Sequence, residues 1–368
     1  MNDVSIATAG ETLRIDYVPR PGLLRITIVN FVLGLVTLTI YRFWGKTQMR
    51  MHIWSCVHIN GEPLEYTGRG IELFKGAMIV LLFFGLPAIL VISGLTLALG
   101  PEHPSVFGVQ TLLFFIVWVL WGAALYRARR YQLSRTLWRG IRGSLDGSPA
   151  TYSLLYFGSL LARAMTLGWS TPVLNLSLQE MMIGHMKFGD MAFRFKGRAG
   201  PLYPTYALCW FLTLLAVVGI FILVAVVIGL SGLAFESLFN DFDFDDTLLF
   251  IAMAIGAILL YLLVYPLIWS VYTAKELAVF ASYTTLDQAR FKLRATGWSI
   301  FRLLFGNALL WLFTLGIAAP YIQQRRVRYL CERMTAEGTV DIDRILQSKA
   351  PLGTAGEGLA DAFDVGGI

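Results

Sequence analysis

Two long stretches of the chain contain no lysine or arginine, and they constrain the fold more than any other feature. Gly76–Tyr126 carries a single charge, Glu102, and the only charges in Ala199–Ala274 are acidic residues between 236 and 246. A helix needs about 20 apolar residues to cross the hydrocarbon core of a bilayer. Each stretch is long enough for two such helices joined by a neutral or acidic turn. The sequence therefore predicts two transmembrane helical hairpins.

The composition agrees with a polytopic membrane protein. Hydrophobic residues make up 56% of the 368 residues and charged residues only 15%, whereas about a quarter of a soluble domain is charged. These values exclude disordered, collagen-like, coiled-coil and disulfide-stapled proteins. Three scattered cysteines, Cys56, Cys209 and Cys331, are too few for a disulfide framework. The first 22 residues lack the pattern of a cleaved signal peptide.

The positive charges lie between the apolar segments. Thirty lysines and arginines against 24 acidic residues give a net charge of +6. Their placement follows the excess of Lys and Arg in cytoplasmic loops, and no separate basic stripe with stacking aromatics accompanies it. We therefore expect the lipid bilayer, including anionic headgroups, as a partner and expect no nucleic acid.

Three further apolar segments, at about 23–44, 152–174 and 301–322, have basic residues on both flanks. Two topologies remain open. In one, all seven apolar segments cross the membrane. In the other, only the two hairpins cross, and the three segments enter from the cytoplasm as re-entrant or surface-lying helices. We prefer the second because it places the basic loops in the cytoplasm. The expected class is an all-α polytopic membrane protein with small cytoplasmic β-hairpins.

The three segments also resemble one another. They align without gaps at offsets of 129 and 277 residues, and internal repeats are expected at about 23–76, 152–205 and 275–334. Glycine followed by proline is typical of a helix end, because glycine relaxes the backbone and proline cannot continue the hydrogen-bond ladder. The repeated helix-end motif comprises Thr37, Thr166, Gly168, Pro172, Thr314, Gly316 and Pro320.

Turn-forming residues after these segments predict short hairpins at 58–68, 187–197 and 285–293. We expect one integral membrane domain over residues 1–334. The acidic tail, 335–368, is expected to be disordered and cytoplasmic.

Candidate contact residues are arginines. Arg163 lies within an apolar segment, where a cation is costly; it either contacts a ligand or lipid, or snorkels or pairs with an acid such as Glu180. Six arginines, 127, 129, 130, 135, 139 and 142, form a basic cluster. Arg135, Arg139 and Arg142 fit one helical face, which suits either a topology determinant or a site for anionic lipid headgroups.

Catalytic and metal sites are not predicted. His52, Cys56 and His58 include ligand types that suit zinc, but no fourth ligand is evident. We therefore predict no cofactor and no metal. The sequence contains no metallopeptidase, serine hydrolase, phosphate-loop or dinucleotide motif.

The chain resembles the YjgN family of bacterial inner-membrane proteins, a family of unknown function. The resemblance rests on segments 29–44, 60–68 and 134–148. It implies an inner-membrane location and no particular reaction. Thr39 and Phe43 differ from the glycine and proline that are usual in the family.

Two functions remain open. The first is non-enzymatic binding or transport of a small molecule or lipid. The alternative is a structural or regulatory partner of another membrane protein, for which the resemblance suggests a membrane-associated metallopeptidase.

Overall fold

The computed structural model describes residues 10–231 and 244–348. The chain divides into two compact units. Unit 1 contains Met1–Arg198, Phe280–Leu293 and Thr314–Ile368, and unit 2 contains Ala199–Val279 and Arg294–Phe313.

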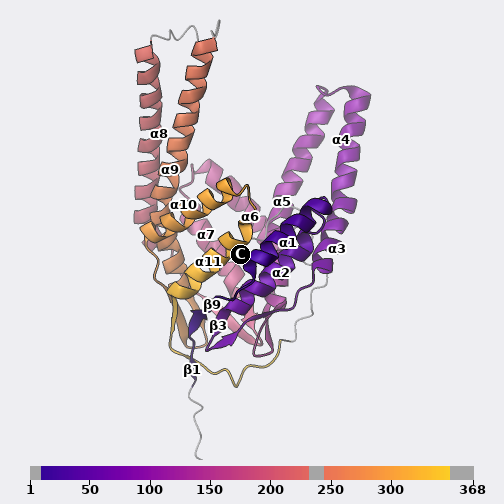
Figure 1. The fold of residues 1–368 in the computed structure, drawn as a ribbon, viewed down its shortest axis with the longest axis vertical. Helices are drawn as coiled ribbons and strands as arrows, with labels where there is room; N and C mark the ends of the chain where they lie inside the picture. Colours follow the sequence, from indigo (N-terminus) through magenta and orange to yellow (C-terminus); the bar gives the residue numbers. More distant parts are fainter. Residues whose placement is uncertain (1–9, 232–243, 349–368) are drawn as a thin grey trace, which may run out of the picture. The chain divides into compact units, whose positions relative to one another are not determined.

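Unit 1 contains one long helical pair, labelled α4 and α5 in Figure 1. The first helix of the pair consists of α3 (Gly70–Val80), a π-helical turn (Leu81–Gly85) and α4 (Leu86–Leu99). The second helix is α5 (Pro104–Ser134), which runs back beside the first. Apolar side chains such as Phe83 and Leu97 point outward, with 79% and 88% of their surface exposed. Such exposure is expected of helices that contact lipid rather than water.

Unit 2 contains the second pair, α8 (Tyr203–Ser231) and α9 (Phe244–Tyr283) up to Val279, preceded by a 3-10 turn at Gly200–Leu202. Trp269 donates a hydrogen bond to Thr213 over 2.9 Å, and the rings of Tyr206 and Tyr272 lie 5.1 Å apart. By length and composition, four helices in the described part of the chain can cross a membrane. They are the four that the two predicted hairpins require.

Each of the three other apolar segments is broken by a turn, which we call an elbow. The elbows are residues 37–41, 166–170 and 314–318. They follow α1 (Leu23–Val36), α6 (Pro149–Met165) and α10 (Gly297–Phe313), and they precede α2 (Arg42–Cys56), α7 (Thr171–Gly184) and α11 (Ala319–Arg333). The 14 residues of α1 span only about 21 Å, against a hydrocarbon core of about 30 Å. The topology with seven crossing helices is therefore not supported.

The elbows share one backbone geometry. Leu38, Leu167 and Leu315 have φ of 48°, 50° and 49°, and their side chains are 84%, 76% and 87% exposed. The amide of Gly168 donates to the carbonyl of Arg163 over 2.8 Å, as in a common helix-ending motif.

The role of the prolines differs from the predicted one. Pro172 and Pro320 stand in the first turns of α7 and α11. They begin the following helix, where a missing N–H costs nothing, and do not end the preceding one.

Five helices lead into strands with at most one intervening residue. The strands are β3 (Val57–Ile59) after α2, β6 (Thr136–Trp138) after α5, β8 (Met186–Phe188) after α7, β10 (Thr284–Leu286) after α9 and β12 (Met334–Glu337) after α11. Two-residue turns connect the first four to β4 (Glu62–Pro63), β7 (Ile141–Leu145), β9 (Met191–Phe195) and β11 (Ala289–Leu293).

All of these strands except β3 and β4, together with β5 (Glu65–Tyr66), build an antiparallel eight-stranded sheet in the order β12-β11-β10-β9-β8-β7-β6-β5. A three-stranded sheet pairs β2 (Ile15–Tyr17) with β3 and β4, and β1 (Glu11–Thr12) pairs with β13 (Thr339–Val340). The structure is mostly helical, but the all-α class was wrong because the predicted hairpins belong to sheets, the larger of which has eight strands. The sequence interpretation also missed the hairpin formed by β6 and β7.

Residues 341–348, assigned to the tail from sequence, lie against the sheet. Asp190 and Leu346 exchange backbone and side-chain hydrogen bonds of 3.0 and 2.9 Å. Ile342 and Ile345 are buried in a cluster with Trp138 and Leu286. Residues 335–340 of the predicted tail form most of β12, the residue after it and β13, and residues 349–368 lie outside the described part of the chain.

Helix α2 is anchored by Ile53, which has no exposed surface and packs in a cluster with Val57 and Val327. We predict that Ile53→Ala lowers the free energy of unfolding by about 2–5 kcal/mol, because it leaves a cavity that the packing cannot close. Thermal unfolding of the protein in lipid nanodiscs measures this. Met51→Ala on the exposed face of α2 is the control, and an equal loss in both variants would contradict the assignment.

Candidate functional site

A cavity of about 680 Å³ lies within unit 1, between helices α5, α6 and α7 and one face of the sheets. Its wall is mostly aliphatic and aromatic. Helical residues that line it include Leu125, Ala128, Arg129, Gln132, Leu133, Tyr152, Gln179, Met182 and Ile183. Residues from the strands include Ile15, Ile59, Thr136, Trp138, Phe188, Phe193, Leu286, Phe291 and Met334.

The wall that α5 contributes is a single helical face. Leu125, Ala128, Arg129, Gln132 and Leu133 recur at intervals of three and four residues, the spacing that places side chains one above another on a helix. The face continues at Thr136, the first residue of β6. This pattern is readable in the sequence, and it is the signal that could have found the cavity.

The sheet wall follows from strand alternation, which places every second side chain on one face. Phe193 and Phe291 stack with ring centres 6.4 Å apart, and Trp138 and Phe188 lie 5.6 Å apart. The indole N–H of Trp138 donates to the carbonyl of Ile59 over 3.2 Å. That bond fixes the ring in the wall and satisfies its only donor.

Arg129 is the exceptional residue of the cavity. Its side chain is exposed and lines the cavity, in a part of unit 1 that is densely surrounded by protein. Across residues 10–231 and 244–348, its guanidinium makes no hydrogen bond and no ion pair. The other cation in the wall, Lys187, is neutralised by Asp146 at 2.6 Å.

Tyr152 adds a second polar group. Helix α6 packs closely on α5 because Gly122 has no side chain; a Cβ there would lie 2.8 Å from the Cα of Ser153. The hydroxyl of Ser153 donates to the carbonyl of Val119. Burial raises the pKa of Tyr152 to about 12, so its hydroxyl keeps its proton at neutral pH and can donate a hydrogen bond. No described residue accepts that bond.

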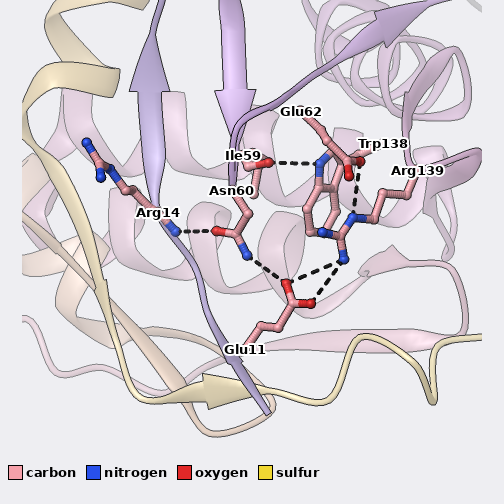
Figure 2. A network of polar contacts seen from close by, with 7 residues as sticks. All are labelled: Glu11, Arg14, Ile59, Asn60, Glu62, Trp138 and Arg139. Carbon is pink, nitrogen blue, oxygen red and sulfur yellow. Dashed lines mark hydrogen bonds and ion pairs between the residues drawn. The ribbon is translucent and has the colours of Figure 1, made fainter. Parts of the chain in front are cut away.

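Arg139 holds a polar network (Figure 2). Its guanidinium binds Glu62 at 3.1 Å and Glu11 at 3.4 Å. Asn60 donates to Glu11 over 2.9 Å and accepts from the amide of Arg14 over 2.7 Å. The network joins the chain before β2 to the turns of two hairpins.

Arg135 and Arg142 also bind within the protein. Arg135 pairs with Glu72 at 2.8 Å, and Arg142 donates to the carbonyl of Ser348 over 2.9 Å. The interpretation of Arg135, Arg139 and Arg142 as one helical face was wrong, because α5 ends at Ser134 and the strands begin there. Contact of these three arginines with lipid headgroups remains a prediction.

Arg163 lies in the last turn of α6, immediately before the second elbow. Its Nη2 donates to Asn175 over 2.6 Å, while its buried Nε has no partner in the part of the chain that is described. The partner on α7 is thus Asn175 and not Glu180. This bond joins the two helices on either side of the elbow.

His52, Cys56 and His58 do not form a metal site with a further ligand. His52 and Cys56 lie on α2 and His58 on β3. In the described ranges, no three His, Cys, Asp or Glu residues are grouped so that they could hold a metal ion.

We predict that the network around Glu11 weakens in acid. The hydrogen bond from Asn60, together with Arg139, holds the pKa of Glu11 below its usual value of 4.5. A carboxyl whose pKa is lowered by folding stabilises the fold at pH values above the pKa that it has in the unfolded chain. This contribution is lost as the pH falls through the pKa that the carboxyl has in the folded protein. Backbone hydrogen exchange of residues 10–17, corrected for intrinsic rates, should therefore accelerate as the pH falls below 4.5. Glu11→Gln should lack this acceleration, and an identical profile in the variant would contradict the prediction.

Comparison with known proteins identifies the family. A search of curated proteins found no match, and a search of solved structures found none either. A family model described as "Bacterial protein of unknown function (DUF898)" matches residues 20–362. This range contains all the helices and the eight-stranded sheet. The chain therefore belongs to the bacterial DUF898 family, which is the YjgN family that its sequence resembles.

Proposed function

We propose that this protein is a non-enzymatic membrane protein that binds a small amphipathic molecule or a lipid in the cavity between α5 and the sheet. The observation that carries the proposal is the cavity itself. Its volume of about 680 Å³ falls within the range of about 300–1,000 Å³ that is typical of small-molecule sites. An apolar wall with a few polar groups is also typical of such sites.

The polar groups of the wall suit binding more than catalysis. Among the described residues, the lining contains a guanidinium, an ammonium, a phenol, two amides and two threonines but no carboxylate, imidazole or thiol. General acid–base and nucleophilic catalysis usually depend on the latter groups. Binding of a ligand needs only complementary shape and charge.

The expected membrane arrangement is part of the proposal. The four long helices cross the bacterial inner membrane, while the elbows enter the hydrocarbon from the cytoplasmic side and do not cross it. The exposed leucines at the elbow tips and the short α1 support this arrangement. The sheet, with its basic residues, then lies in the cytoplasm as the charge rule requires. The shared elbow geometry also supports the proposed internal repeat.

Accessible cysteines test this topology. In a background without Cys56, Cys209 and Cys331, Glu102→Cys between α4 and α5 should react with an impermeant maleimide in intact cells. Gln288→Cys in the β10–β11 turn should react only after the cells are permeabilised. Leu167→Cys at an elbow tip should resist the reagent from both sides because it lies in hydrocarbon. Reaction of Gln288→Cys in intact cells would overturn the proposed orientation, and reaction of Leu167→Cys there would overturn the re-entrant elbow.

A cavity-filling substitution tests the binding site. We predict that a photoactivatable C16 alcohol in nanodiscs crosslinks to wall residues such as Trp138 and Phe193. Ala281→Trp, on the wall, should reduce this crosslinking several-fold because the indole occupies the cavity. Ala192→Trp is the matched control, since Ala192 is exposed on the opposite face of β9. Crosslinking that is the same in both variants, or absent from the wall, would contradict the proposed function.

A further inference from the structure

We propose that the ligand of this cavity is a long-chain carboxylate, such as a fatty acid, whose headgroup binds Arg129 while its chain lies along the aromatic wall. This inference rests on the proposed function and names the class of ligand. It is carried by the combination of an unpaired guanidinium and an apolar wall in one cavity.

The first step is the cost of the charge. A cation removed from bulk water is strongly unfavourable unless an anion or several acceptors compensate it. The side chain of Arg129 is exposed, and a ligand that fills the cavity would displace the water that solvates its guanidinium. Arg129 has no such partner among the described residues, and the wall contains no carboxylate. A ligand anion would supply the missing compensation.

The second step is the amount of charge. Lys187 is already neutralised by Asp146. Arg130, next to Arg129 on α5, points away from the cavity wall and donates to the carbonyl of Leu145 over 2.9 Å. The cavity therefore offers one uncompensated positive charge, which matches a headgroup with one negative charge.

The third step is the chemistry of the headgroup. A guanidinium presents parallel N–H donors that bind both oxygens of a carboxylate at once. Tyr152 and Gln179 line the same cavity, and neither side chain has a hydrogen-bond partner in the described ranges. Each can donate a further hydrogen bond to an oxygen of the headgroup.

The fourth step is the remainder of the ligand. The wall beyond these polar groups is formed by side chains such as Leu125, Ile183, Phe188 and Phe193. An acyl chain buries its whole length favourably against such a surface. Helix α5 continues from the membrane-spanning segment to the cavity, so a molecule dissolved in the bilayer is close to its site.

The test compares two probes that differ only in the headgroup. Photoactivatable palmitate and the photoactivatable C16 alcohol are added to the full chain in nanodiscs of zwitterionic lipid, and crosslinked residues are mapped by mass spectrometry. We expect palmitate to label the cavity wall at about tenfold lower concentration than the alcohol, which corresponds to about 1.4 kcal/mol. Arg129→Gln should abolish this preference while the alcohol still labels. Arg129→Lys should retain part of the preference, and Arg127→Gln, a neighbour on α5 that does not line the cavity, should leave it unchanged.

The remaining outcomes separate this inference from the proposed function. Equal labelling by both probes in the wild-type protein would overturn the carboxylate and leave the binding function standing. Absence of labelling by either probe would overturn both. If deletion of residues 349–368 is required before palmitate labels the wall, the acidic tail, with Asp361 and Asp364, occupies the site and the inference is wrong. Preferential labelling by a photoactivatable two-chain phosphatidylglycerol over palmitate would also overturn it.

Discussion

The structure depends on helices that pass into strands almost without loops. The ends of a helix leave backbone groups unpaired, and these groups need new partners. At five places the chain leaves a helix and, after at most one residue, enters the hydrogen-bond ladder of a sheet. Because the helix ends are tied to the sheet in this way, the helices of unit 1 and the strands that follow them share one framework. Hairpins with strands of two to five residues would be marginal alone, and the eight-stranded sheet stabilises them together.

This connection also creates the candidate site. Helix α5 reaches β6 after a single residue, so its last turns are held over the face of the sheet. The helical face from Leu125 to Leu133 then opposes the alternate side chains of the strands. Close packing at Gly122 brings α6 and Tyr152 to the same wall.

Much of the fold could be predicted from local patterns. The stretches without lysine or arginine predicted the four long helices, and the repeated Thr-Leu-Gly segments marked two of the elbows. The strand order of the sheet could not be predicted, because pairs between hairpins join distant residues such as Glu65 with Leu137 and Arg290 with Glu337. Strands this short carry almost no periodic signal. The contacts of Arg135, Arg139 and Arg142 were missed for the same reason, since their partners lie far away in sequence.

The arginine cluster shows why composition alone could not locate the site. Arg130, Arg135, Arg139 and Arg142 are bound to carbonyls or carboxylates, and Arg127 is exposed on the same helix. In sequence they are equivalent to Arg129, yet only Arg129 places an uncompensated charge in the apolar cavity. Because the side chain of Arg129 is exposed, water solvates its charge while the cavity is empty. A ligand that fills the cavity would remove this water, and an anionic headgroup would then compensate the charge.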